Sequence, residues 1–289
     1  MIPQAKFSKT LNHQGFQVVP DYHMHTPRCN HATGDIRAYA QAACDAGLSE
    51  IGMSDHSPMP HGFDKAWRMD ESELSSFIAE VQAAQVEFKG QLSIKSALEV
   101  DFYPGAEPYI QHLAAQHNWD YLMGSVHFIG DWGFDNPDEV AKFESCDLEQ
   151  VYCDYFDVLG QSAATGLFDV IGHPDLIKKF GYVLEQPSSR VEAAEDAMLA
   201  AVKAADVVLE ISSAGLRKPV AEMYPREGLV EKAAALHIPF TYGSDAHSPA
   251  EVGFAMDDCL SVLLKYGIKE VATFRQRKRT MMPLKVITG

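Results

Sequence analysis

The sequence predicts an α/β barrel of seven strand-helix units, folded as a single domain over residues 1–289. Two observations predict this fold. Short apolar runs alternate with longer segments of helical pattern along the whole chain, and no low-complexity segment, repeat or linker divides it. Strands that alternate with helices pair in parallel through right-handed crossovers, and seven such units are enough to close a barrel. Barrels of this class commonly reach 289 residues as one domain.

The predicted strands are short apolar runs that end in polar residues. Runs of this length, bounded by polar residues or glycine, are typical of strands buried in a parallel sheet. In chain order, they span residues 16–20, 49–54, 92–98, 121–126, 168–172, 207–211 and 238–242.

The segments between these runs are predicted to be helices, at residues 35–46, 70–88, 104–118, 148–165, 191–205, 228–236 and 251–266. The first is rich in alanine, begins at Gly34 and Asp35, and has Gly47 just past its end as a C-cap. Residues 128–146 form a long, aromatic and acidic segment, so we expect an excursion over one face of the fold that acts as a lid or binding loop. A basic tail around residues 275–279 closes the chain.

The composition excludes several classes of function. A formal net charge of -16 would repel a polyanion, so we expect no nucleic-acid partner, although a small phosphorylated substrate is compatible with metal ions in a cleft. No uninterrupted apolar run reaches membrane-spanning length and the N-terminus lacks a signal-peptide pattern, so we expect a cytoplasmic protein without membrane contact. The five scattered cysteines form no Cys-x-x-Cys pair, which argues against a disulfide framework and a thiolate zinc site.

Residues of metal-binding type follow six of the seven predicted strands. His23 and His25 are two residues apart where an extended segment ends, so both imidazoles point to one face and can bind the same ion. The other five ends carry Asp55 with His56, Glu99, His127, His173, and Asp245 with His247. The remaining end, residues 212–218, carries hydroxyls and cations. Because the carboxyl ends of barrel strands converge at the active site, we expect one cluster.

The predicted ligands are nitrogen and oxygen atoms, which suit zinc, manganese or ferrous iron. They exceed what one ion needs, so we expect two or three divalent ions, with Glu99 able to bridge a pair. His61 is a candidate for substrate contact. Four other histidines are interpreted as surface or terminal residues: His13, His112, His117 and His237.

These residues resemble the motifs of the polymerase and histidinol phosphatase (PHP) family of metal-dependent phosphoesterases. The resemblance extends over about residues 20 to 250, and its segments occur in the family's order at residues 21–26, 51–56, 97–99, 124–127, 172–175 and 243–247. It implies a distorted (β/α)7 barrel that holds three divalent ions.

The resemblance also implies the ligands of each ion. They are His23, His25, Glu99 and Asp245 for the first, Glu99, His127 and His173 for the second, and His31, His56 and His247 for the third. Cys29 lies two residues before His31, and its thiolate is an alternative ligand that would change the metal preference. Asp21 and Asp55 either orient ligand imidazoles or form structural hydrogen bonds at strand ends.

Residues 175–180 and 211–218 look most like the stand-alone histidinol-phosphatase branch, although lysines stand at 178 and 179 where that branch often has an arginine. The resemblance therefore implies hydrolysis of L-histidinol phosphate, a step of histidine biosynthesis. We expect a hydroxide held between two ions that share Glu99 to attack phosphorus in line. Asp245, His247 or a metal-bound water near the third ion would assist the leaving alcohol, and the sequence does not choose between them. The predicted substrate-binding residues are Arg217, Lys178 and His61.

Three alternatives stay open. The substrate could be another small phosphate ester or a nucleotide. A binuclear amidohydrolase shares the His-x-His strand end, but that class usually needs a lysine at a strand end, and no predicted strand ends in one. A non-catalytic metal-binding barrel is the third alternative, and the complete ligand set argues against it. Trp67 and residues 132–134 are expected either to form walls for an imidazole-bearing substrate or to make an oligomer contact. The oligomeric state is not predicted.

Overall fold

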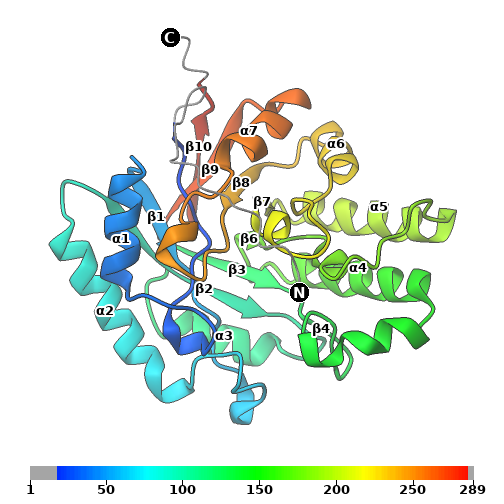
Figure 1. The fold of residues 1–289 in the computed structure, drawn as a ribbon, viewed down its shortest axis with the longest axis horizontal. Helices are drawn as coiled ribbons and strands as arrows, with labels where there is room; N and C mark the ends of the chain where they lie inside the picture. The colour runs from blue at the N-terminus through cyan, green and yellow to red at the C-terminus, as the bar shows by residue number, and fades with distance from the viewer. Residues whose placement is uncertain (1–17, 286–289) are drawn as a thin grey trace, which may run out of the picture.

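The computed structural model describes residues 18–285, which form an α/β barrel with its helices around the outside of the sheet (Figure 1). The parallel strands pair in the order β1-β2-β3-β6-β7-β8. They span Glu50–Met53 (β1), Ser93–Asp101 (β2), Tyr121–Ser125 (β3), Val170–Ile171 (β6), Val208–Ser212 (β7) and Phe240–Gly243 (β8). The helices span Ile36–Asp45 (α1), Leu74–Glu87 (α2), Glu107–Ala115 (α3), Leu148–Ala164 (α4), Ser189–Ala204 (α5), Glu227–Ala235 (α6) and Met256–Lys265 (α7).

Residues 21–25 close the barrel between β1 and β8. On the β1 side, the amide nitrogen of Gly52 donates to the carbonyl oxygen of Asp21 at 2.8 Å. On the β8 side, the amide nitrogen of His25 donates to the carbonyl oxygen of Ala246 at 3.0 Å. The segment thus takes the place of the first strand, although only isolated bridges mark it.

The first strand was predicted a few residues too early. Residues 16 and 17 lie outside the described part of the chain, and residues 18–20 have no strand pairing. The strand role belongs to residues 21–25 because they carry the backbone hydrogen bonds to both neighbours.

The C-terminal region is an antiparallel hairpin and not the predicted basic tail. Its strands are Glu270–Arg275 (β9) and Lys278–Pro283 (β10), and β9 extends the sheet beside β8. Val271 and Phe274 are buried, while most residues of β10 are exposed. Lys278 and Arg279 therefore belong to an edge strand, where charged side chains reach water, while Arg275 ends β9 and Arg277 lies in the turn.

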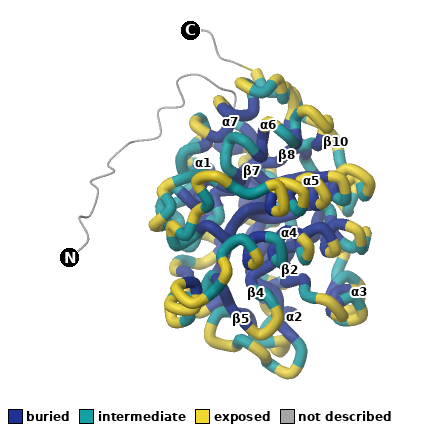
Figure 2. The backbone as a smooth tube through the Cα atoms, turned by 90° about the vertical axis from the view of Figure 1, so that its right-hand side faces the viewer, coloured by how far each residue is buried: buried dark blue, intermediate teal, exposed yellow. Residues whose placement is uncertain are grey.

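The long segment after β3 is an excursion, as predicted. It contains the short hairpin of β4 (Phe128–Ile129) and β5 (Trp132–Gly133), followed by a 3-10 segment at Pro137–Ser145. Figure 2 labels both short strands, which lie next to buried parts of the backbone.

Local sequence explains how the helices cover the sheet, and α1 is an example. The Asp35 side chain caps it by accepting from the amide nitrogen of Ala38 at 2.8 Å. Its buried residues recur at helical spacing and form one apolar face: Ile36, Tyr39, Ala40 and Ala43. Figure 2 shows the same division along the molecule, with exposed stretches on the outer helices and buried strands inside. No helix within residues 18–285 is long and apolar enough to cross a membrane.

The amino-terminal half of the barrel is filled by side chains. This buried cluster consists of Tyr22, Ala97, Tyr121, Met123, Val170, Val208, Ala272 and Phe274. Several members precede a polar residue on the same strand by two positions, as Ala97 precedes Glu99 and Val208 precedes Glu210. Since residues two apart on a strand share a face, these polar residues also point into the barrel, nearer its carboxyl end.

Candidate metal centre

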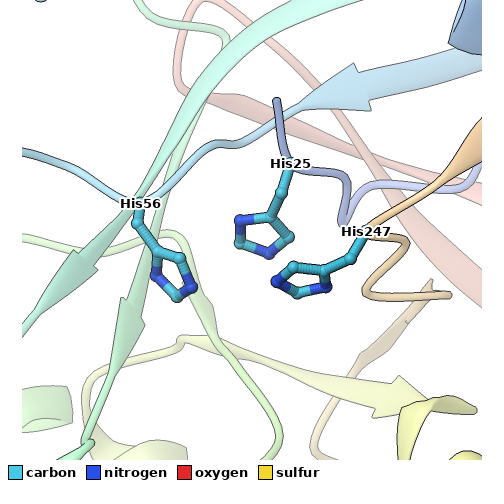
Figure 3. A group of neighbouring side chains, drawn as sticks. All are labelled: His25, His56 and His247. Carbon is cyan, nitrogen blue, oxygen red and sulfur yellow. The ribbon is translucent and has the colours of Figure 1, made fainter. Parts of the chain in front are cut away.

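Histidines from distant strand ends meet at the carboxyl end of the barrel. His25 ends the closing segment, His56 follows β1 and His247 follows β8, and their rings face a common space (Figure 3). The ring centroid of His25 lies 4.3 Å from that of His56 and 4.1 Å from that of His247. His31 lies beside them, with its ring centroid 4.5 Å from that of His247. The structure therefore brings together the three ligands predicted for the third ion and places His25 among them.

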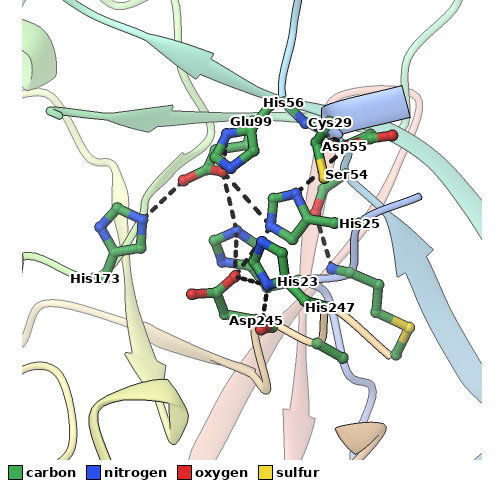
Figure 4. A network of polar contacts seen from close by, with 12 residues as sticks. His23, His25, Cys29, Ser54, Asp55, His56, Glu99, His173, Asp245 and His247 are labelled. Carbon is green, nitrogen blue, oxygen red and sulfur yellow. Dashed lines mark hydrogen bonds and ion pairs between the residues drawn. The ribbon is translucent and has the colours of Figure 1, made fainter. Parts of the chain in front are cut away.

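Glu99 lies at the centre of a second group (Figure 4). It is fully buried in β2, with Oε1 2.8 Å from Nε2 of His173 and 3.6 Å from Nε2 of His127. The other oxygen, Oε2, lies 2.8 Å from Nδ1 of His56 and 3.4 Å from Nε2 of His23. Each oxygen of Glu99 thus faces different imidazoles, which is the arrangement of a bridging carboxylate.

Four predicted ligands, His23, His25, Glu99 and Asp245, lie close to one another. The Oδ1 atom of Asp245 lies 3.0 Å from Nε2 of His25 and 3.8 Å from Nε2 of His23. The Oε2 atom of Glu99 lies 3.7 Å from Nε2 of His25. Ligands about 2.1 Å from a tetrahedral ion are about 3.4 Å from one another. The spacing therefore fits a divalent ion among these four side chains.

Several of these ligand atoms are buried without a hydrogen-bond partner within the described residues. They include Nε2 of His23, Nε2 of His25, Oε2 of Glu99 and Nε2 of His247. A buried polar atom without a partner costs free energy, so native proteins rarely leave a group of them unpaired. Metal ions would provide the missing partners, and the residues present fit them.

The electrostatics of the cluster favours ionised carboxylates. Burial raises the pKa of Glu99, but the surrounding histidines, led by His56 and His23, together outweigh burial and hold this pKa well below its usual range. Asp245 behaves in the same way. Burial raises its pKa, but the neighbouring histidines, led by His23 and His25, outweigh burial and hold this pKa well below its usual range. Burial also lowers the pKa of His247, which favours the neutral imidazole. Ionised carboxylates and neutral imidazoles are the forms that bind metal.

Two further carboxylates hold ligand histidines in place. Oε1 of Glu210, in β7, lies 2.7 Å from Nδ1 of His23. Oδ1 of Asp101, in β2, lies 2.8 Å from Nδ1 of His127. The role of Glu210 was not predicted from the sequence, and the signal was a carboxylate inside an otherwise apolar strand. Such contacts fix the orientation of a metal-binding imidazole and leave the other nitrogen for the ion.

The two aspartates considered for this orienting role differ. Asp21 accepts hydrogen bonds from the amide nitrogens of Ser244 and Gly253, both at 2.8 Å, so it joins strand ends as a structural residue. Asp55 has Oδ1 3.5 Å from Nδ1 of His25 and also accepts from the Thr26 hydroxyl. Of the two, Asp55 is the one placed to orient an imidazole.

Cys29 is buried in the same region. Its sulfur atom lies within 4.8 Å of nitrogen atoms of His31 and His247, so the alternative thiolate ligand is geometrically compatible. Burial raises the pKa of Cys29 to about 12, which disfavours a thiolate in the absence of metal. Its carbonyl oxygen also lies 2.7 Å from Nδ1 of His31, which leaves Nε2 as the ligand atom of that ring.

A cavity of about 340 Å³ lies over the cluster. Its lining includes His31, His56, Glu99, His127, His173, Asp245 and His247. Aromatic walls come from Trp67, Phe128, Phe180 and Tyr224. Trp67 lines the cavity, which agrees with the first of the two roles expected for it, whereas Trp132 and Phe134 are 3% and 1% exposed and pack into the core. A molecule bound in this cavity would touch the predicted metal ligands directly.

Comparison with known proteins identifies the family. The family model described as the PHP domain matches residues 21–214, which is most of the chain. This chain belongs to the PHP domain family. The predicted resemblance is therefore confirmed, and the PHP fold agrees with the barrel described above.

Relatives of this PHP domain chain extend over nearly the same length. A Deinococcus radiodurans protein named "Probable histidinol-phosphatase" is 48% identical over 258 residues, which cover 89% of this chain and 97% of the relative. The histidinol-phosphatase of Bacillus subtilis is 29% identical, with 82% of this chain and 96% of the relative covered. The structure of histidinol phosphate phosphatase from Lactococcus lactis, complexed with zinc, L-histidinol and phosphate, has a TM-score of 0.77 at 22% identity. It covers 90% of this chain and 98% of that one. This last likeness supports the fold.

The residues predicted to bind substrate do not line the cavity of this PHP domain. Lys178 is buried, and its Nζ lies 2.9 Å from Oδ2 of Asp175 and 2.7 Å from Oε2 of Glu222, so its charge is already paired. Arg217 donates from Nη2 to the carbonyl oxygens of Ser244 and Asp245, at 2.8 and 3.0 Å. His61 is exposed in a short 3-10 turn, away from the cavity lining. The structure thus places all three outside the cavity lining, and their roles in substrate binding stay a prediction.

Other cations face the cavity instead. Arg68, Lys179 and Lys218 line it. Arg68 is paired with Asp101, and Nζ of Lys179 lies 3.2 Å from Oδ2 of Asp135. Within residues 18–285, the side chain of Lys218 has no hydrogen bond or ion pair, and it follows Arg217 directly. Of the two adjacent cations at this strand end, Lys218 lies in the cavity lining and Arg217 does not.

Proposed function

We propose that this chain hydrolyses L-histidinol phosphate to L-histidinol and phosphate, as a metal-dependent phosphomonoesterase of histidine biosynthesis. The observation that carries the proposal is the group of imidazoles around the two oxygens of Glu99, at the base of a cavity. The 48% identity to a relative named as a histidinol-phosphatase supports the substrate. The complex of the Lactococcus lactis protein with zinc, L-histidinol and phosphate supports both substrate and metal.

Three divalent ions are proposed as cofactors, with zinc, manganese and iron as candidates. The first would lie among His23, His25, Glu99 and Asp245, in which each carboxylate has an oxygen 3.0 to 3.8 Å from Nε2 of both histidines. The second would lie among Glu99, His127 and His173, and the third among His31, His56 and His247. When bound, such ions supply Lewis acidity, which activates water and offsets the charge of a phosphate.

The residues of the chain have distinct tasks in this scheme. Glu99 holds its negative charge between the two groups of imidazoles, since its pKa is low. Lys218 is proposed to bind a phosphate oxygen, because its ammonium group lines the cavity without a partner within the described residues. Asp245 and His247 also line the cavity, with Oδ1 and Nδ1 3.4 Å apart, and either could hold the proton that the leaving alcohol takes up.

The test is phosphate release by protein reconstituted with zinc, manganese or iron. We expect the kcat/KM for L-histidinol phosphate to exceed that for other small phosphomonoesters and nucleotides by at least about tenfold, which corresponds to about 1.4 kcal/mol of transition-state stabilisation. The Glu99→Gln protein, purified in the same way, measures contaminating phosphatase. A higher kcat/KM for another ester would show that L-histidinol phosphate is not the substrate. Metal binding without phosphate release would favour the non-catalytic barrel. Growth of histidine-requiring cells that depend on this protein is the matching test in cells.

A further inference from the structure

The cavity contains more carboxylates than the proposed metals need. Besides the ligands Glu99 and Asp245, it is lined by Asp64, Asp135 and Glu139. Asp64 is paired with Arg68, with its Oδ2 atom 2.8 Å from Nε of the arginine. Asp135 is paired with Lys179, as described above. Within the described residues, no hydrogen bond or ion pair engages the carboxylate of Glu139.

Glu139 is held in a defined position on the cavity wall. It lies at the start of the 3-10 segment Pro137–Ser145, which Asn136 caps by accepting from the amide nitrogen of Asp138 at 3.0 Å. The amide nitrogen of Glu139 donates to the carbonyl oxygen of Asn136 at 3.0 Å. A Cβ atom at Gly133 would lie 3.3 Å from Oε1 of Glu139, so the absence of a side chain there leaves room for the carboxylate.

The wall that carries Glu139 is packed into the protein. Trp132 is buried against Phe143, with ring centroids 4.6 Å apart. Phe134 is buried against Tyr155. Lys179, from the loop after β6, donates to the carbonyl oxygen of Asp135 at 2.8 Å. Glu139 therefore projects from an anchored segment, and its charge is available at a fixed place.

The lining of the cavity thus holds, within the described part of the chain, one unpaired cation and one unpaired carboxylate besides the metal ligands. Lys218 follows β7 and interacts with the charge of Asp245 in the metal cluster. Glu139 belongs to the excursion after β3. A ligand that carries an anion at one end and a cation at the other would satisfy both.

We propose that Glu139 binds the ammonium group of the substrate and so selects amino-alcohol phosphates over phosphate esters without a cation. This inference rests on the proposed function, since L-histidinol phosphate carries a primary ammonium group at a distance from its phosphate. The carboxylate of Glu139 accepts a charge-assisted hydrogen bond from that group. Such a bond is stronger than a hydrogen bond between neutral groups. Glu139 is a specificity-determining residue and takes no part in the bond-breaking step.

The experiment compares the metal-loaded wild type, Glu139→Gln and Asp138→Asn. Asp138 is the neighbouring exposed carboxylate outside the cavity lining, so its variant makes the same change in net charge. Two substrates are used: L-histidinol phosphate and p-nitrophenyl phosphate, which has no cation. Binding of L-histidinol alone is measured by calorimetry. In Glu139→Gln, the ratio of the two kcat/KM values should fall at least about tenfold, and the Kd of L-histidinol should rise by a similar factor. Asp138→Asn should change neither by more than about twofold.

Each outcome decides one point. If Glu139→Gln keeps the wild-type substrate ratio and the wild-type Kd, the proposed role of Glu139 is wrong. The same holds if Asp138→Asn shows an equal loss, because the effect would then be one of overall charge. Failure of the proposed function is seen separately, in a wild type that hydrolyses p-nitrophenyl phosphate but not L-histidinol phosphate. In that case the calorimetric Kd values of wild type and Glu139→Gln still decide whether Glu139 binds the amine.

Discussion

The Oε1 atom of Glu210 lies 2.7 Å from Nδ1 of His23, and neither side chain is exposed to solvent. The second oxygen of Glu210 accepts from the backbone nitrogen of His173 at 2.7 Å. One carboxylate therefore positions two proposed metal ligands from different strands. Gly243 permits this contact, because a Cβ atom at that position would lie 1.9 Å from Oε1 of Glu210.

Glu210→Ala should lower the metal affinity of the proposed first site by about 10- to 100-fold, which is typical when a carboxylate behind a ligand histidine is lost. The unfolding free energy of the metal-free protein should also fall, by about 1–3 kcal/mol, because two buried donors lose their acceptor. Metal titration and chemical denaturation measure these effects. Glu231→Ala, at an exposed position of α6, is the control. Unchanged metal affinity in Glu210→Ala would show that His23 is positioned by other contacts.

Glu99→Gln should reduce kcat by more than about 100-fold. This loss is larger than the one expected when a residue that only orients a metal ligand is replaced. Both proposed ions that share Glu99 lose an anionic ligand, so the metal content per chain should fall together with activity. Elemental analysis and phosphate release on the same preparation provide the comparison. A Glu99→Gln protein with normal turnover would contradict the bridging arrangement.

Lys218→Met and Arg217→Met should have different effects although the residues are adjacent. Lys218→Met should raise the KM and the inhibition constant of inorganic phosphate by about tenfold or more, because a hydrogen bond to a charged group is lost. Its metal content should stay normal. Arg217→Met should instead lower stability and metal content, because Arg217 supports the backbone of Asp245. Equal effects of the two variants on phosphate inhibition would support the prediction from the sequence that Arg217 binds the substrate.

The ion pair between Asp135 and Lys179 should make stability depend on pH in the acid range. Burial raises the pKa of Asp135, but the attraction of Lys179 and His127 lowers it more, to about 2. An acid with a lowered pKa stabilises the fold above its unfolded pKa of about 4, and this contribution is lost as the pH falls toward about 2. The shift corresponds to about 2 kcal/mol, which we reduce to about 1 kcal/mol because the side chain is 24% exposed.

Asp135→Asn tests this dependence. The difference in unfolding free energy between wild type and Asp135→Asn should be largest above about pH 4 and should shrink as the pH approaches about 2. Denaturation at several pH values measures it. A difference that stays constant across this range would mean that the ion pair does not contribute to stability.

Sequence reasoning could foresee which of the proposed metal ligands lie close together, because the relevant signal is local. Each candidate histidine or carboxylate follows an apolar run, and the carboxyl ends of parallel strands meet at one end of a barrel. Glu99, His127 and His173 could therefore be placed together from the order of residues alone. The alternation of strands and helices likewise predicted the α/β barrel.

The same reasoning could not foresee which groups a side chain contacts across the fold. Lys178 and Arg217 are cations near strand ends, and nothing in the adjacent sequence shows that Glu222 and the carbonyl oxygen of Ser244 occupy them. Glu210 was passed over because its partner, His23, lies 187 residues away in the chain.

The sequence by itself determined the barrel class, the family and the side chains that gather at one end of the strands, since these follow from periodicity and from the order of short motifs. Only the tertiary structure decided that residues 21–25 close the ring, that Lys218 and Glu139 are the charges left unpaired among the described residues of the cavity, and that Glu210 supports His23. The physical reason is that hydrogen bonds and ion pairs join groups that are close in space, and folding brings those groups together from distant parts of the chain.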